Sequence, residues 1–189
     1  MYLRMFWPLA LALFVGARHP TPTVVLVKQT DVIRSTLNGA TQFFVRKVTI
    51  GKGDLARIRQ SVDFSPEDPD ISFYLGKTEG GNLQGVVLFP QVNTTHGPIE
   101  VGLTLKPDGT VASAVVTKAT VETKPWVEEA VAPGLLKRFQ GLRYGDDPKR
   151  ALAQLSPGQM GQMPYWEAGV IAAAVQQGLV LHHVLFHQT

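Results

Sequence analysis

The segment best suited to hold a ligand is LSPGQMGQMPYWEAGVIAAAV, residues 155–175. Glycines, prolines and methionines there precede a run of small apolar residues that predicts a helix. The first amides of a helix have no internal partner and carry partial positive charge, so they attract anions. Met160, Met163, Tyr165 and Trp166 supply soft and aromatic side chains that pack well on a flat ring. The segment predicts either a ligand-binding loop or simple core packing around a turn.

The sequence lacks the common patterns of catalysis. It contains no G-x-S-x-G nucleophile elbow, no H-E-x-x-H, no Walker loop and no G-x-G-x-x-G. Two carboxylate pairs, Glu128–Glu129 and Asp146–Asp147, join neighbours in sequence, and such neighbours on a helix point in different directions. We therefore expect a binding domain or a carrier rather than an independent enzyme.

Histidines lie in two informative places. His182, His183 and His187 form H-H-x-x-x-H, in which the last two would share a helix face. The residues around them are apolar, so we expect surface or partly packed histidines and predict no metal site. His96 lies in NTTHGPIEV, at a Gly-Pro turn before the most regular strand pattern, where its ordinary role is that of a polar turn residue.

Length and composition limit which classes of protein the chain can belong to. The 189 residues are enough for one well-packed domain, with 44% hydrophobic and 17% charged residues. The formal charge is only +3 and the basic residues are scattered, so we expect no nucleic-acid partner. The sequence has no cysteine, which excludes disulfides, thiolate metal sites, iron–sulfur clusters and c-type haem attachment.

The first residues indicate export from the cytoplasm. Arg4 precedes an uncharged run from Met5 to Val15, and small residues occupy positions 15 and 17. This pattern predicts a secretory signal over residues 1–17 or, alternatively, an uncleaved short membrane anchor. In both cases the domain is extracytoplasmic, either periplasmic or secreted. We expect a linker over 18–29 and a single domain over 30–189.

Patterning predicts an α+β fold with an antiparallel sheet of about four to five strands and helices packed at its N- and C-terminal parts. A helix is expected from Thr30 or Asp31 to Leu37, followed by a second helix after Gly51. The C-terminal part predicts two short helices over 124–142, a capped turn at Asp147, and a final helix over about 165–177 that Gly178 ends or bends. The expected strands cover 43–50, 71–77, 83–89, 99–105 and 111–120.

The order of these segments resembles the FMN-binding domain family, which includes flavin-carrying subunits of Rnf-type and sodium-translocating NADH:quinone oxidoreductase complexes. The likeness covers about residues 30–175. It rests on LNGATQFFVRKVTI with DLARIRQSV, on the central hairpins with the His-Gly-Pro-Ile turn, on a return strand ending in Glu122-Thr123, and on LLKRFQGL. The resemblance implies a carrier of FMN in extracytoplasmic electron transfer, with a membrane redox complex or another redox protein as its partner.

The resemblance also implies which residues would lie at the flavin. Family members read S/D-G-A-T-x-S/T before the last helix, and the threonine there can be esterified to the FMN phosphate. In this chain Gly161-Gln162-Met163 or Gln162-Met163-Pro164 stands at that place, so any FMN would be held non-covalently. The Gly-Ala-Thr triplet at 39–41 lies before the central strands and is expected to be an ordinary helix stop. The implied cofactor-binding residues are His96, Glu122, Thr123, Ser156, Gly158, Gly161, Met163 and Tyr165.

Three alternatives stay open from the sequence. The chain is either a non-covalent flavin carrier, a flavin-free secreted binding or assembly module that keeps the fold, or a module for a different flat ligand. No Lys or Arg lies between Ser156 and Tyr165, and Lys149 and Arg150 are the nearest cations, which weakens phosphate binding. The sequence does not indicate an oligomeric state.

Overall fold

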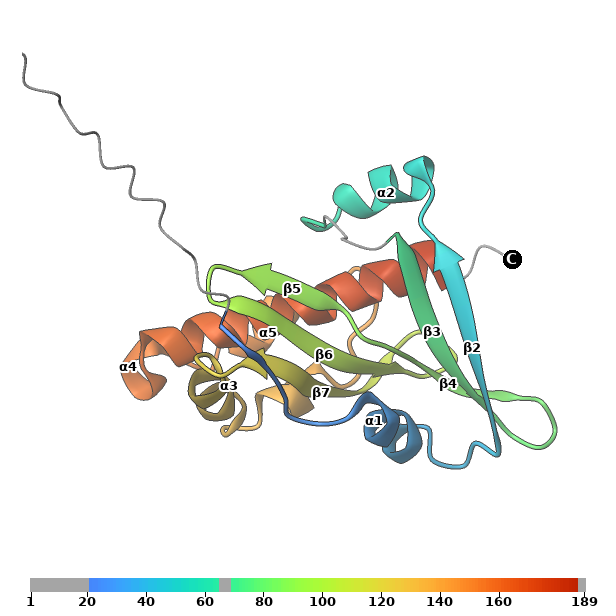
Figure 1. Cartoon of the computed structure of the whole chain (residues 1–189), viewed down its shortest axis with the longest axis horizontal. Helices are drawn as coiled ribbons and strands as arrows, with labels where there is room; N and C mark the ends of the chain where they lie inside the picture. The colour runs from blue at the N-terminus through green and yellow to red at the C-terminus, as the bar shows by residue number, and fades with distance from the viewer. Residues whose placement is uncertain (1–20, 65–68, 187–189) are drawn as a thin grey trace, which may run out of the picture.

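The protein is built on one antiparallel sheet that carries a long helix across one face (Figure 1). The computed structural model describes residues 21–64 and 69–186, and the predicted signal or anchor over 1–17 lies outside them. Within the described residues the α+β class is confirmed, with seven strands and five α-helices. The expected count of four to five strands is wrong.

The strands pair in the order β1-β7-β6-β4-β3-β2, and β5 pairs with β6 beside the end of β4. The two unexpected strands are the shortest, and both are too short to show an alternating pattern. One of them, β1, falls within the segment 18–29 and pairs Thr23 with Thr120. The strands are β1 (Thr23–Val25), β2 (Gln42–Thr49), β3 (Asp70–Lys77), β4 (Leu83–Leu88), β5 (Gln91–Thr94), β6 (Gly97–Leu105) and β7 (Val111–Thr120).

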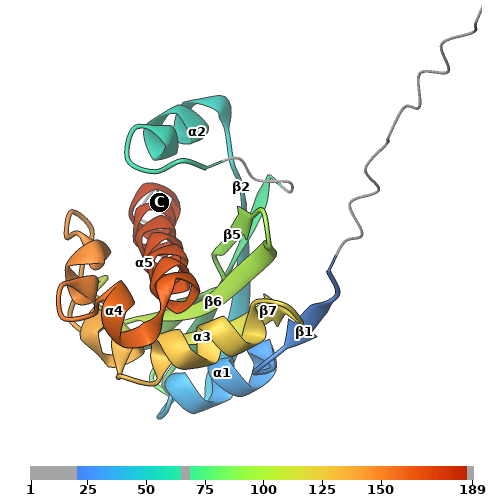
Figure 2. The ribbon, with the colours of Figure 1, turned by 90° about the vertical axis from the view of Figure 1, so that its left-hand side faces the viewer.

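Helices cover both faces of the sheet (Figure 2). The long helix α5 packs on one face, and α1 packs on the other, where Val32 and Leu37 contact Val87. Short 3₁₀ turns η1 (Leu135–Phe139) and η2 (Pro148–Leu152) connect the C-terminal helices. The α-helices are α1 (Gln29–Thr36), α2 (Lys52–Arg59), α3 (Lys124–Val131), α4 (Pro157–Met160) and α5 (Gln162–Leu181).

The helix α5 is longer than its sequence pattern predicts. It continues through Gly178 into a π-helical turn, η3 (His182–Phe186), so of the two expectations for Gly178, the one that it ends the helix is wrong. A side chain at Gly178 would meet Leu103 Cδ2 at 2.6 Å and Pro90 Cγ at 3.1 Å, so glycine lets the helix lie close against the sheet. Residues 162–186 are apolar and long enough to span a membrane by composition and length, but 72% of that span's most apolar window is buried inside the protein.

We expect Gly178→Ala to lower the free energy of unfolding by about 2 kcal/mol, because the added methyl overpacks fully buried Leu103 and rigid Pro90. The matched control is Gly169→Ala in the same helix, where nothing lies within 4 Å of the new methyl and a gain of about 0.5 kcal/mol is expected. Urea denaturation of both variants measures the difference. Equal stabilities would contradict the close packing of α5 on β6.

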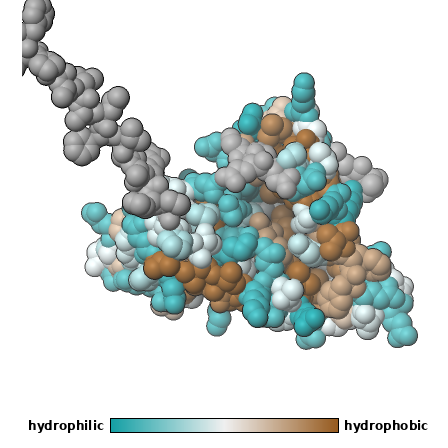
Figure 3. Space-filling model, in the orientation of Figure 1, coloured by the Kyte–Doolittle hydropathy of each residue, from teal (hydrophilic) through white to brown (hydrophobic). Residues whose placement is uncertain are grey.

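The strand β2 forms one edge of the sheet and exposes apolar side chains. Phe43, Phe44 and Val45 are 50%, 48% and 57% exposed, and hydrophobic surface gathers over the β2–β3 end in Figure 3. The next residues, Arg46 and Lys47, are charged, and charges on an edge strand disfavour pairing with another chain.

The sheet forks between β3 and β5. From Tyr74 to Lys77, β3 pairs with β4, but its first half, from Asp70 to Phe73, pairs within the described residues only with β2. On the other side of the fork, β5 pairs in that part of the chain only with β6. Among the described residues, β3 and β5 are therefore not paired with each other at the fork.

Candidate ligand-binding site

His96 lies in the turn between β5 and β6, and the backbone fixes its position. The next residue, Gly97, has φ of 105°, a left-handed conformation that favours glycine. A side chain at Gly97 would also collide with Thr120 Cγ2. The Thr120 hydroxyl donates to the His96 carbonyl oxygen at 3.1 Å, and the His96 N–H donates to Thr94 Oγ1 at 3.1 Å. The turn is therefore tied to both β5 and β7.

The end of β7 brings Glu122 to this turn. The backbone N–H of Thr120 donates to Thr123 Oγ1 at 3.0 Å, and the N–H of Thr123 donates to Thr120 Oγ1 at 3.1 Å. This reciprocal pair satisfies the buried hydroxyls and sets the corner from which α3 begins. Glu122, inside the corner, then places Oε1 3.0 Å from Nδ1 of His96. The sequence-predicted residues His96, Glu122 and Thr123 thus come together.

Two tryptophans enclose the His96 ring. Trp126 of α3 lies 5.3 Å from it between ring centroids at 87°, and Trp166 of α5 lies 5.7 Å away at 77°. Both contacts are edge-to-face, a favourable arrangement for aromatic rings. We call His96, Glu122, Trp126 and Trp166 the His96 cluster. The His96 ring therefore contacts both indole rings and the Glu122 carboxylate.

Glu167 lies beside the His96 cluster and is fully buried. Neither of its carboxylate oxygens has a hydrogen-bond partner among the described residues. Burial raises the pKa of Glu167 to about 7, and the charge of protonated His96 opposes that rise. The sequence reasoning missed both Glu167 and Trp126, because burial and ring contacts are set by the packing of α3 against α5.

The loop predicted to hold a phosphate offers few donors. Ser156 and Gly158 lie at the short helix α4, and Gly161, with φ of 84°, separates α4 from α5. Met163 and Tyr165, in the first turn of α5, are half-buried. The N–H of Tyr165 donates to the carbonyl oxygen of Gly161 at 3.3 Å.

Among the described residues, only two amides at the start of α5 make no hydrogen bond and are left for a ligand. They belong to Gln162 and Met163, because Pro164 has no N–H. The loop supplies no cation and no threonine, while the unpaired carboxyl of Glu167 lies one turn further along the helix. A dianionic phosphate needs more donors than this, so the residues do not fit the phosphate of FMN.

The C-terminal histidines take part in ring packing. His182 is buried and stacks on Phe186 with centroids 4.8 Å apart, and His183 stacks on Tyr144 at 3.7 Å. His187 lies outside the described residues. Within 21–64 and 69–186, no group of three His, Asp or Glu side chains has the geometry of a metal site.

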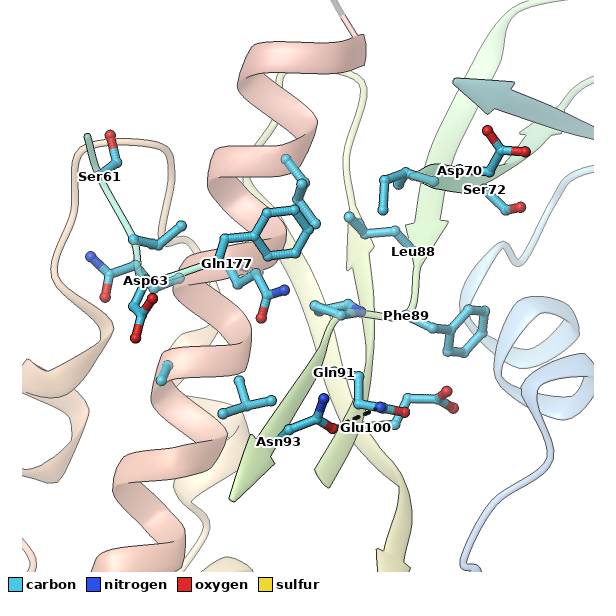
Figure 4. A pocket seen from close by; sticks show the side chains of 18 of the residues that line it. Ser61, Asp63, Asp70, Ser72, Leu88, Phe89, Gln91, Asn93, Glu100 and Gln177 are labelled. Carbon is cyan, nitrogen blue, oxygen red and sulfur yellow. Dashed lines mark hydrogen bonds between the residues drawn. The ribbon is translucent and has the colours of Figure 1, made fainter. Parts of the chain in front are cut away.

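A cleft with a volume of about 1010 Å³ opens at the fork in the sheet (Figure 4). We call it the fork cleft. It lies between α5, the segment after α2, the first half of β3, and the bend from β4 to β5. This volume is at the upper end of the range typical of ligand pockets. The polar side chains that line it are Ser61, Asp63, Asp70, Ser72, Tyr74, Gln91, Asn93, Glu100, Lys149, Gln176 and Gln177.

Amides, hydroxyls and carboxylates dominate this lining. Gln91 Nε2 donates to Asn93 Oδ1 at 3.0 Å, and Asp70 Oδ1 accepts from Thr49 Oγ1 at 2.6 Å. Glu100 is balanced by Lys118, whose Nζ lies 2.7 Å from its Oε2. Of the lining residues the sequence analysis named only Lys149, as a cation near the loop, because the others come from separate segments and form no local motif.

Comparison with known proteins assigns no family to the chain. A scan against protein-family models, a search of curated proteins and a search of solved structures each found no match. The likeness to the FMN-binding domain family therefore stays a prediction from sequence.

Proposed function

We propose that the chain is a flavin-free binding module that takes its ligand in the fork cleft. The observation that carries the proposal is the cleft itself, which collects amide, hydroxyl and carboxylate groups from α5, β3 and β5 around apolar side chains such as Leu88 and Val92. Convergent polar groups on an apolar surface are the usual composition of a binding site. This proposal takes up the flavin-free alternative that the sequence left open.

The start of α5 supports the same choice. An electron carrier needs its flavin phosphate neutralised, and the two amides of Gln162 and Met163 are a poor substitute for a cation or a covalent link. Where the ring would lie by resemblance, the His96 cluster packs on itself. We therefore propose no membrane redox complex as partner. An extracytoplasmic location remains proposed from residues 1–17 alone.

Absorbance and flavin titration test this function. We expect purified full-length protein to lack the flavin absorbance bands near about 370 and 450 nm. We also expect the fluorescence of added FMN to be unchanged by the protein. A yellow protein whose colour is released by acid would overturn the proposal and make the loop at Gly161 a rebuilt flavin site. Colour that stays with acid-precipitated protein would overturn it as well, through a covalent link.

A further inference from the structure

We propose that the ligand of the fork cleft is a short, uncharged oligosaccharide whose hydroxyls pair with the side-chain amides of Gln176 and Gln177. This inference rests on the proposed function, since it names the class of ligand for the same cleft. Three features of the cleft support it, namely a buried amide without a protein partner, polar groups that converge from several elements, and the lack of a cation cluster among the described lining residues.

Gln177 contributes a buried amide that has no protein partner. The residue is only 6% exposed, and no hydrogen bond joins its side chain to another described residue. Gln177 nevertheless lines the fork cleft, and Figure 4 shows it on α5, directed toward the bend from β4 to β5. Buried amides are normally hydrogen-bonded, because leaving one unpaired is costly. A ligand that pairs with Gln177 therefore completes a site that the chain leaves incomplete.

The helix α5 presents a second amide beside the first. Gln176 and Gln177 lie three and four positions after Ala173, so the three residues share one side of α5, and all of them line the cleft. The small side chain of Ala173 leaves room next to the amides. A side-chain amide carries an acceptor oxygen and donor N–H groups, so it can pair with two neighbouring hydroxyls of one sugar ring.

Other elements around the cleft add hydroxyls and apolar surface. Ser61 follows α2 and Ser72 lies on β3, while Leu88 and Val92 contribute apolar side chains. A sugar ring carries hydroxyls around its edge and apolar C–H groups on its faces, so it matches polar groups that are spread around an apolar surface. A purely hydrocarbon ligand would leave the Gln177 amide unpaired, which excludes it as the preferred ligand.

The charges of the cleft favour an uncharged ligand. Lys149 is the one basic residue among the described lining residues, so the cleft has no cluster of cations to hold phosphate, sulfate or carboxylate groups. The carboxylate of Glu100 is balanced by Lys118. Asp63 and Asp70 are exposed, so water already solvates their charges and a cationic ligand would gain little there. Neither an anionic nor a cationic sugar is therefore favoured over a neutral one.

The probes are the neutral trisaccharides maltotriose, cellotriose and triacetylchitotriose, each added to ¹⁵N-labelled full-length protein. We expect at least one of them to shift the side-chain amide signals of Gln176 and Gln177 in a saturable way. Trigalacturonate, an anionic trisaccharide, is expected to bind at least about tenfold more weakly than that sugar, because no cation cluster receives its carboxylates. Deacetylated chitotriose, in which amines replace the acetamides, is expected to bind no more tightly than the acetylated form. Tighter binding of either charged sugar would overturn the uncharged ligand.

Removing the Gln177 amide tests its role directly. Gln177→Leu keeps an apolar side chain of similar size, so we expect about tenfold weaker binding of the responsive trisaccharide together with unchanged or greater stability to urea. Gln159→Leu, at an exposed position of α4 outside the cleft lining, is the matched control and is expected to bind as the original chain does. A Gln177→Leu variant with lower stability and unchanged affinity would show a structural role for the amide and overturn the inference.

Filling the space beside the amides is a second test. Ala173→Leu places a longer side chain in the cleft, so we expect binding of the same trisaccharide to weaken at least about fivefold. Equal affinities of this variant and the original chain would mean that the sugar lies elsewhere, and the inference would be wrong.

The remaining outcomes separate this inference from the proposed function. If no neutral sugar shifts the Gln177 amide while an acetylated and amidated tri-alanine peptide does, the sugar ligand is wrong and the binding module stands. If neither sugar nor peptide shifts it, the sugar ligand is wrong as well, and the flavin titration described above decides the proposed function. Binding of FMN with no shift of the cleft residues by any sugar or peptide overturns both proposals.

Discussion

Replacing Gly97 with alanine is expected to lower the free energy of unfolding by about 3 kcal/mol. Two costs add, since a φ of 105° is unfavourable for any residue with a side chain and the new methyl would collide with Thr120 Cγ2. The collision falls on the corner that holds His96 and Glu122, where Thr120 cannot move without losing its hydrogen bonds to Thr123. Urea denaturation followed by tryptophan fluorescence measures the loss.

Gly53→Ala is the control for this change. Gly53 lies in α2, a methyl group added there would have no neighbour within 4 Å, and its φ is not left-handed, so alanine is expected to stabilise by about 0.5 kcal/mol. If the free energy of unfolding of Gly97→Ala lies within about 0.5 kcal/mol of that of the original chain, the turn at His96 can accommodate a side chain and is not constrained as described above.

Replacing Glu167 with glutamine is expected to stabilise the protein at high pH and to have little effect at low pH. Burial raises the pKa of Glu167 to about 7 from its ordinary value of 4.5, so the folded state holds a proton that the unfolded state releases. The free energy of unfolding therefore falls as pH rises from about 4.5 to about 7, by on the order of 3 kcal/mol, and is level above. Glutamine does not ionise, and its gain at pH 8 is expected to be about 2 kcal/mol.

Denaturation at pH 4.5 and pH 8 checks this prediction. Glu128→Gln serves as control, because Glu128 is exposed and only weakly paired with Lys124 at 3.8 Å, and its effect is expected within about 0.5 kcal/mol at both pH values. A Glu167→Gln variant that is less stable than the original chain at pH 8 would mean that the carboxylate has a favourable partner, and His96 is the charged group that acts on it.

Regular patterns made much of the fold predictable. Alternation at Ile99, Val101, Leu103 and Leu105 predicted β6, and the structure confirms it, because one face of that strand is buried under α5. The α5 helix was predicted too short, since its ends depend on packing. Gly178 is a helix-breaking signal on its own, yet the helix runs through it because the glycine contacts the sheet closely.

The candidate site was predictable only where a local motif existed. His96 and Glu122 were named because their turn and strand end resemble those of the FMN-binding domain family, and the structure brings the two side chains to 3.0 Å. The burial of Glu167 depends on how α5 packs against its neighbours. The helical pattern of the sequence does not predict that packing. The fork cleft arises because β3 pairs with β4 only from Tyr74 onward and diverges from it over Asp70–Phe73, and no property of either strand alone indicates that divergence.

The pairing of β1 with β7 sets the order in which the fold can be completed. Val24 lies opposite Ala119, so roughly a hundred residues must be synthesised before the first strand finds its partner. Closing so long a loop is slow compared with forming the β6–β7 hairpin, whose strands are joined by one short turn. The beginning of the domain is thus among the last parts to be fixed in place, and folding during synthesis would have to start from its middle.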